Sequence, residues 1–189
     1  MCIRDSLDSF GFFTPEEIKE AVRLCSYQTI NKGAYFFEGG KVCEQVAFVQ
    51  SGIFRHFYLD DLGEEVTYCF TFPNNFVTAY SSFVSNQSTP EQIQALTAGH
   101  LLVMPKKEIE RLVNTHKGWM AFAKIIAEKQ YIKRENRIFL LQKEKAKLKY
   151  QHLLQTKPEY LQTIPLQYLA SYIGITQRHL SRLRREVSF

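Results

Sequence analysis

The sequence lacks several patterns that mark other classes of protein. No apolar run approaches the roughly 18 residues that a membrane-spanning helix needs. The N-terminus does not show the basic-then-apolar pattern of a signal peptide. No internal repeat or low-complexity tract occurs either. A chain of 189 residues, 45% of them hydrophobic, is therefore expected to form one large or two small globular domains with no membrane partner.

Metal-binding and catalytic patterns are also missing. The four cysteines show no CxxC pairing and have no nearby histidine partner; they are Cys2, Cys25, Cys43 and Cys69. No His-x-His occurs, and His56 and His100 stand alone, whereas a cupin-type enzyme needs two or three converging histidines and a carboxylate. No Ser/His/Asp or Cys/His arrangement is evident. We expect no metal site, no disulfide framework, no cofactor and no catalytic residues, with idle thiols in a reducing cytoplasm.

Charge is distributed unevenly along the chain. Residues 1–116 carry 9 Lys/Arg against 14 Asp/Glu, a net charge of −5, whereas residues 117–189 carry 15 Lys/Arg against 5 Asp/Glu, a net charge of +10. An acidic first half would repel a polyanion and a basic second half would attract one. A nucleic-acid partner is therefore expected to meet only the second half.

The last part of the chain contains two short apolar stripes at helical spacing. Leu166, Leu169, Ala170 and Ile173 form the first, and Leu180 and Leu183 form the second. Gly174 favours the left-handed turn that ends a helix, and Thr176 is a good N-cap for the next. This pattern predicts a helix-turn-helix whose second helix enters a DNA major groove. The alternative is an ordinary helical hairpin with a solvated basic face.

The region before this stretch is predicted to begin with a helix and to continue as a series of short strands. Residues 9–23 are predicted to form a lead-in helix, with Thr14–Glu17 as its cap and Phe13, Ile18, Ala21 and Val22 on its packing side. Seven strands are predicted at 25–30, 34–37, 45–51, 53–58, 65–72, 92–98 and 101–105, a spacing typical of an all-β barrel or jelly roll. Eight phenylalanines are expected to fill it: Phe36, Phe37, Phe48, Phe54, Phe57, Phe70, Phe72 and Phe76.

Helices are predicted between the barrel and the C-terminal stretch. A short one covers 106–113, and a long segment from about 118 to 155 is broken once or twice. In its first part, positions 118, 122, 125, 126, 129 and 132 share one helical face, which is apolar at 122, 125, 126 and 132. Pairing with the same helix of a second chain would cover this surface, and folding back onto its own barrel is the alternative. The segment around Tyr150 and Tyr160 is expected to support the helix-turn-helix.

The order of these parts resembles the Crp/Fnr family of bacterial transcription regulators. The resemblance covers about 10–186 and rests on three segments: 32–39 and 46–55, which look like the family's first strands and turns, and 164–176, which is similar to versions common in Bacteroidetes. It implies an α+β fold with a cyclic-nucleotide-binding-like β-barrel (jelly roll), a long dimerisation helix and a C-terminal helix-turn-helix. The corresponding ranges are 9–116, 117–142 and 143–189.

The chain departs from the cyclic-nucleotide-binding members of that family. Those members carry a Gly-Glu pair for the ribose and an Arg-Ser/Thr-Ala for the phosphate, whereas this chain has Phe76–Phe83 and Ser88–Gln92 at those places. We therefore expect that it does not bind cyclic AMP. The polar side chains there would bind another small effector or form a solvated loop; they are Thr78, Tyr80, Ser81, Ser82, Gln87 and Thr89.

The resemblance implies a homodimeric regulator of double-stranded DNA that recognises a near-palindromic operator and contacts RNA polymerase. By the family's pattern Gln177, Arg178 and Arg182 would contact bases. Phosphate contacts would come from Thr176, His179, Ser181, Arg184 and Arg185. The alternative is a ligand-binding barrel that acts through protein contacts. Residues 1–6 are expected to be foreign to the native chain. The end at Phe189 leaves no room for a β-hairpin wing, which indicates a short-form regulator or a truncated sequence.

Overall fold

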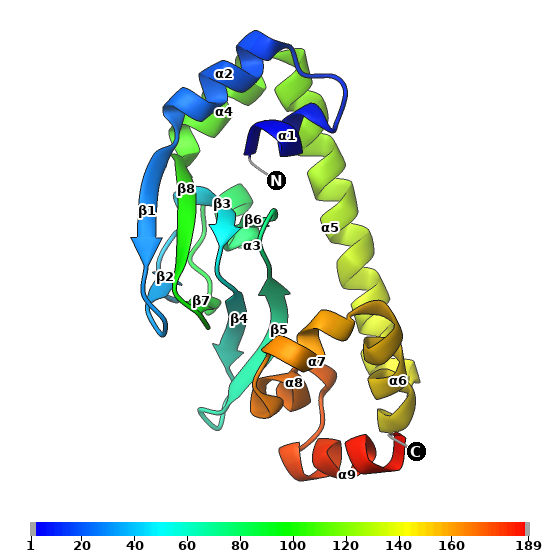
Figure 1. The fold of residues 1–189 in the computed structure, drawn as a ribbon. Coiled ribbons are helices and arrows are strands. Elements are labelled where there is room, and N and C mark those ends of the chain that lie inside the picture. The colour runs from blue at the N-terminus through cyan, green and yellow to red at the C-terminus, as the bar shows by residue number, and fades with distance from the viewer. Residues whose placement is uncertain (1–2, 188–189) are drawn as a thin grey trace. The chain divides into compact units, whose positions relative to one another are not determined.

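The computed structural model describes residues 3–187, so Met1, Cys2, Ser188 and Phe189 lie outside the described part. Its helices are α1 (Ile3–Asp8), α2 (Pro15–Leu24), α3 (Tyr80–Ser85), α4 (Lys106–Thr115), α5 (Lys117–Lys143), α6 (Ala146–Thr156), α7 (Pro158–Thr163), α8 (Leu166–Ile173) and α9 (Gln177–Val187). Its strands are β1 (Ser26–Ile30), β2 (Tyr35–Phe37), β3 (Gln45–Ser51), β4 (Phe54–Leu59), β5 (Glu65–Thr71), β6 (Phe76–Val77), β7 (Gln92–Ala95) and β8 (Gly99–Pro105) (Figure 1).

The internal contacts divide the chain into two compact units. The first unit contains the residues up to Tyr58 and the segment Phe70–Ala127. The second contains Leu59–Cys69 and the residues from Glu128 onward. Strand β5 and helix α5 therefore each run from one unit into the other.

Two antiparallel four-stranded sheets build the β region. Their strand orders are β1-β8-β3-β6 and β2-β7-β4-β5. Strand β8 pairs with β3 from Gln45↔Pro105 onward and with β1 from Ser26↔Val103 to Ile30↔Gly99. All seven predicted strands are present within a residue or two at most ends, and the predicted jelly roll is confirmed. The additional strand β6 has only two residues, which is too short for a periodic signal.

The phenylalanines divide between two cores. Phe36, Phe37 and Phe54 lie in the barrel cluster, which also contains the apolar residues Ile30, Cys43, Ala47, Val49, Val77, Ala79, Ile93, Ala95, Leu101 and Val103. Phe48 and Phe76 instead pack in a second cluster, with Trp119 and Phe122 of α5. Successive strand residues face opposite sides of a sheet, so Phe48 lies opposite its neighbours Ala47 and Val49. The expectation that all eight fill the barrel is therefore confirmed for Phe36, Phe37 and Phe54 and wrong for Phe48 and Phe76.

The second cluster is closed by the N-terminal helices. The Thr14 hydroxyl accepts a hydrogen bond from the Glu17 backbone N–H (3.2 Å), and the Thr14 N–H donates to the Glu17 carboxylate (2.8 Å). This capping box begins α2 at Pro15, so the predicted cap is confirmed and the predicted start of the helix at residue 9 is wrong. Helix α1 was not predicted, and its residues Ile3 and Leu7 are buried in the same cluster. Since two of its apolar residues are buried, α1 is an integral part of this core.

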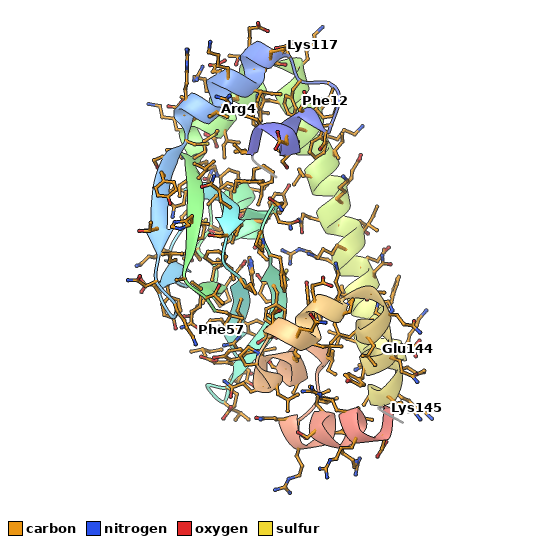
Figure 2. The ribbon with its side chains drawn as sticks, in the orientation of Figure 1. Arg4, Phe12, Phe57, Lys117, Glu144 and Lys145 are labelled. Atoms are coloured by element: carbon orange, nitrogen blue, oxygen red, sulfur yellow. The ribbon has the colours of Figure 1, made fainter. Side chains whose placement is uncertain are left out.

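The long helical segment is confirmed, with one break. Figure 2 labels Glu144 and Lys145 at that break, between α5 and α6. In the first unit, the start of α5 packs on its own chain through Trp119 and Phe122, as the fold-back alternative supposed. Farther along, Ile132 and Phe139 remain 55% and 45% exposed. The N-terminal part of α5 is therefore packed against its own chain, while its later part keeps exposed apolar side chains.

Candidate nucleic-acid interface

Helices α8 and α9 are joined by a tight turn at Gly174. The backbone of Gly174 is left-handed (φ 69°, ψ 42°), its N–H bonds to the Ser171 carbonyl (3.1 Å), and the Ile175 N–H bonds to the Ala170 carbonyl (3.0 Å). These two bonds satisfy carbonyls at the end of α8 that have no partner within the helix. Most side chains with a Cβ are strained at this φ, so glycine is favoured here.

Thr176 begins the second helix as predicted. Its hydroxyl accepts a hydrogen bond from the His179 backbone N–H (3.2 Å), and its carbonyl accepts one from the Leu180 N–H (3.0 Å). One of the free N–H groups of the first turn is thereby satisfied. Thr176 therefore fixes the point from which α9 projects its side chains.

A small apolar core holds the two helices together. Its residues are at most 4% exposed: Leu169, Ala170, Ile173, Leu180 and Leu183. Because Ala170 has only a methyl side chain, the helices can approach closely at that point. The predicted apolar stripes are confirmed here, apart from Leu166, which is half-buried.

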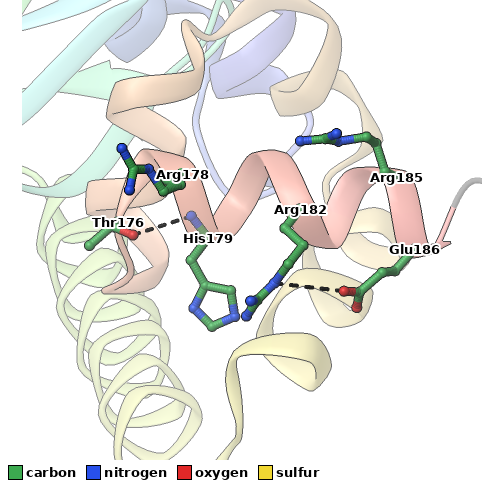
Figure 3. A pocket seen from close by; sticks show the side chains of 6 residues that line it. All are labelled: Thr176, Arg178, His179, Arg182, Arg185 and Glu186. Carbon is green, nitrogen blue, oxygen red and sulfur yellow. Dashed lines mark hydrogen bonds and ion pairs between the residues drawn. The ribbon is translucent and has the colours of Figure 1, made fainter.

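The opposite face of α9 is exposed and basic. A hollow of about 810 Å³ lies along this face, and Figure 3 shows the side chains that line it. It is lined by five of the residues predicted to contact DNA, Thr176, Arg178, His179, Arg182 and Arg185, and by Glu186. Gln177 and Arg184 are exposed and Ser181 is half-buried, but these three predicted residues do not line the hollow.

Glu186 was not singled out from the sequence. Its carboxylate lies 3.7 Å from Arg182 Nε, and the two side chains are 50% and 67% exposed. The i,i+4 spacing on a helix is the signal that could have indicated the pair. An exposed pair of this kind contributes about 1 kcal/mol or less, so Arg182 can readily exchange Glu186 for another anion.

The first part of the candidate effector segment folds as strand β6 and helix α3, whereas residues 86–90, which include Gln87 and Thr89, form a largely exposed loop. The Thr78 hydroxyl donates to the Gln45 carbonyl (2.9 Å). The buried Ser82 hydroxyl accepts from the Cys43 N–H (2.9 Å) and donates to the Gln87 carbonyl (2.6 Å). The hydroxyls of Thr78 and Ser82 are therefore engaged in holding the segment together.

The remaining polar residues of the segment differ in exposure. Thr89 accepts a hydrogen bond from the Glu91 N–H (3.3 Å). Ser81 and Gln87 are exposed, and Tyr80 is half-buried at the start of α3. The structure thus leaves Ser81 and Gln87 as the two members whose side chains point most freely to solvent.

The buried Lys106 side chain forms hydrogen bonds at the C-terminal end of helix α3. The Lys106 ammonium donates to the Phe83 carbonyl and to Asn86 Oδ1 (2.6 Å), and Asn86 is left-handed (φ 58°). A cation at a helix C-terminus is favoured by the helix dipole. The serine-rich run of α3 has little intrinsic helix propensity, so this tertiary contact accounts for a helix that the sequence did not predict.

A second buried polar group lies inside the barrel. His56 Nδ1 lies 2.8 Å from the Glu91 carboxylate, and His56 Nε2 lies 2.9 Å from the Thr71 hydroxyl. The His56 and Glu91 side chains are each 7% exposed. His56 is therefore paired within the fold. In the described residues, no group of three or more His, Cys, Asp or Glu side chains could hold a metal ion.

The comparisons with known proteins agree with this architecture. Residues 27–116 match the family model of the cyclic nucleotide-binding domain. With helix α5 and the C-terminal helices, the chain has a fold similar to that of a solved regulator assigned to the Crp/Fnr family. The fold implied by the sequence resemblance is thereby confirmed. No curated protein matches the sequence.

Three solved structures illustrate the likeness. A protein from Eubacterium rectale assigned to the Crp/Fnr family superposes with a TM-score of 0.76 at 15% identity, covering 97% of this chain and 88% of its own. FixK2 from Bradyrhizobium japonicum gives 0.74 at 14% identity, covering 87% and 84%. The catabolite activator protein of Thermus thermophilus gives 0.62 at 18% identity, covering 97% and 86%. Among the described residues, no helix is long and apolar enough to span a membrane.

Proposed function

We propose that this chain is a sequence-specific DNA-binding transcriptional regulator of the Crp/Fnr type. The observation that carries the proposal is helix α9, which buries Leu180 and Leu183 and exposes a basic face. It follows a capped, glycine-ended turn, as in a DNA-reading helix-turn-helix. The net charge of +10 on residues 117–189 supports a polyanionic partner for this half of the chain. Acting on chromosomal DNA, the protein would work in the cytoplasm and catalyse no reaction.

The exposed residues of α9 are assigned two roles. Arg178 and Arg182 can each grip guanine O6 and N7, and Gln177 can do likewise with adenine. Phosphate contacts, which position the protein without specifying sequence, are assigned to Thr176, His179, Ser181, Arg184 and Arg185. Thr176 would act through the backbone N–H groups that begin α9.

We propose that α5 pairs with the same helix of a second copy. Met120, Tyr131, Ile132, Ile138 and Phe139 are each between 45% and 68% exposed on this helix. Large apolar side chains on one helix are the surface that a two-fold helix pair covers. Residues 9–116 would then serve as sensor, 117–142 as dimerisation helix and 143–189 as DNA-binding domain. A two-fold dimer recognises a near-palindrome with half-sites about one DNA turn apart.

Selection of binding sequences from a random DNA pool tests this function. We expect a near-palindromic consensus and an affinity that falls steeply as salt rises, because phosphate contacts release counterions. The competing function is a ligand-binding barrel that acts through protein contacts. An enriched pool with no consensus, or an affinity insensitive to salt, would favour that alternative.

A second expectation concerns the effector. The segment 76–92 contains no arginine to hold a cyclic phosphate, and Lys106 is engaged by the end of α3. Glu91, close to the position where the family places its phosphate-binding residues, is buried and bonded to His56. Titration calorimetry with cyclic AMP should therefore show no saturable heat, and cyclic AMP should not raise the melting temperature. Stabilisation at micromolar nucleotide would show that the pocket is functional after all.

A further inference from the structure

Strand β5 is an edge strand with an unusual partner. It lies last in the order β2-β7-β4-β5, so within residues 3–187 no strand pairs with one side of its backbone. Within the second unit, the Ser171 hydroxyl of α8 accepts a hydrogen bond from the Thr67 N–H (2.8 Å) and donates one to the Glu65 carbonyl (3.1 Å). One side chain of α8 thus takes the place of a strand partner at two backbone groups.

Arg137 of α5 reaches the same place. Its Nη2 donates to the Tyr172 carbonyl (2.7 Å) and to the Thr67 carbonyl (3.4 Å), and its guanidinium lies 4.1 Å from the centre of the Tyr172 ring. Tyr172 is the penultimate residue of α8, so its carbonyl has no partner within the helix. A charged donor is especially favourable at this end of the helix dipole.

The Tyr172 ring provides the packing surface for this cation. Burial raises the pKa of the Tyr172 hydroxyl, and the charge of Arg137 opposes the rise. The phenol therefore stays neutral near pH 7, and Arg137 meets an uncharged aromatic face. Tyr172 also packs edge-on against Tyr160 of α7, with ring centres 5.8 Å apart. The end of α8 is thus held from two sides.

These contacts link three elements of the second unit. Thr67 is held through its N–H by Ser171 and through its carbonyl by Arg137, while Arg137 also holds the end of α8. Helix α8 in turn packs on α9, and Ala170 of α8 and Leu180 of α9 are both buried. Any rotation of the helix-turn-helix relative to α5 must break the bonds made by Arg137.

We infer that Arg137 and Ser171 are positioning residues that fix α9 relative to α5 and so set the spacing between half-sites that the dimer accepts. This inference rests on the proposed function, since spacing matters only to a dimer that reads DNA. Neither residue lies on the exposed face of α9, so neither contacts bases. Their effect is on geometry: one base pair corresponds to about 3.4 Å along the duplex, and a rigid dimer tolerates few such steps.

Operators with altered spacing test the inference. The selected operator is compared with versions lengthened or shortened by one and two base pairs, and with a single half-site. Wild-type protein should bind best at one spacing and lose affinity on either side. The double variant Arg137→Gln/Ser171→Ala should lose about tenfold at the best spacing, the equivalent of about 1.4 kcal/mol, and discriminate less between spacings. Its affinity for the single half-site should stay within about twofold of wild type.

Two further variants control for nonspecific damage. Arg134→Gln removes a cation one turn earlier on α5, whose guanidinium lies over Tyr68 at 5.8 Å, and should keep the wild-type spacing preference. Ser171→Thr retains the hydroxyl and should restore discrimination relative to Ser171→Ala. An unchanged, sharp spacing optimum in the double variant would overturn the inference and leave DNA binding itself intact.

A measurement without DNA distinguishes a failure of the Ser171–Thr67 contact from a failure of the proposed regulator function. Amide hydrogen exchange at Thr67 should accelerate in Ser171→Ala, because its N–H loses its hydrogen-bond acceptor, and should not change in Arg134→Gln. Unaltered exchange at Thr67 refutes the contact on which the inference stands. Wild-type protein that selects no operator, with Thr67 exchange accelerated as expected, refutes the regulator function instead.

Discussion

The double variant Arg178→Ala/Arg182→Ala is expected to lose about 2–6 kcal/mol of operator binding, because each bidentate arginine contact contributes about 1–3 kcal/mol and separated positions add approximately. Both side chains line the exposed hollow of α9, and neither is part of the apolar core between α8 and α9. The loss should therefore come without a loss of stability. The single variant Arg182→Ala should cost about 1–3 kcal/mol and relax the preference at one base pair.

Quantitative gel shifts on the selected operator and on single-base variants measure this loss and its position. Two controls bracket the result. Lys107→Ala removes an exposed cation from α4 of the first unit and should leave operator affinity unchanged. Glu186→Gln removes the acid that faces Arg182 and should raise affinity, since a carboxylate repels phosphate. Equal affinity and base preference in the double variant and wild type would refute the assignment of these arginines.

The variant Phe54→Ala is expected to destabilise the first unit by about 3–5 kcal/mol. Phe54 is fully buried (0% exposed), pairs in register with Ala95 of β7, and meets the Phe36 ring at 6.4 Å. Removing the ring leaves a cavity that a pair of hydrogen-bonded sheets can only partly close. The loss is a large share of the stability of an ordinary domain.

Denaturant unfolding followed by intrinsic fluorescence measures the change as a shift in midpoint. Trp119 lies in the other cluster of the same unit, which makes it a reporter that the substitution does not touch. Leu62→Ala is the matched control: Leu62 is 88% exposed, so its substitution should cost about 0.5 kcal/mol or less. Equal midpoints for Phe54→Ala and Leu62→Ala would show that Phe54 does not hold the barrel together.

Elements with a strong local signal were predictable from the sequence. The capping box at Thr14, the turn at Gly174 and the cap at Thr176 each depend on a residue whose conformational preference acts within a few positions. The strands could be predicted because they are rich in β-branched and aromatic residues and are bounded by turn residues. Helix α9 combined such a signal with a charge pattern, so its exposed residues could be named in advance.

Features that depend on distant contacts could not be predicted. Helix α3 is supported by Lys106, which lies 20 residues or more along the chain from the groups it bonds. Ser171 meets Thr67 across 104 residues, and no local pattern marks either residue. The assignment of Phe48 to the barrel was wrong. Alternation along a strand shows that its two faces differ, but it does not show which of the two faces packs inside the barrel.

The path of the chain between its two units also has a consequence for protein engineering. The chain crosses from one unit to the other after Tyr58, after Cys69 and after Ala127. No single cut in the chain can therefore separate the two units from one another. A chimera that grafts these C-terminal helices onto a relative's barrel would need to bring the segment Leu59–Cys69 with them. Without that segment, Ser171 and Arg137 would lose the hydrogen bonds that they make to the backbone of Glu65 and Thr67.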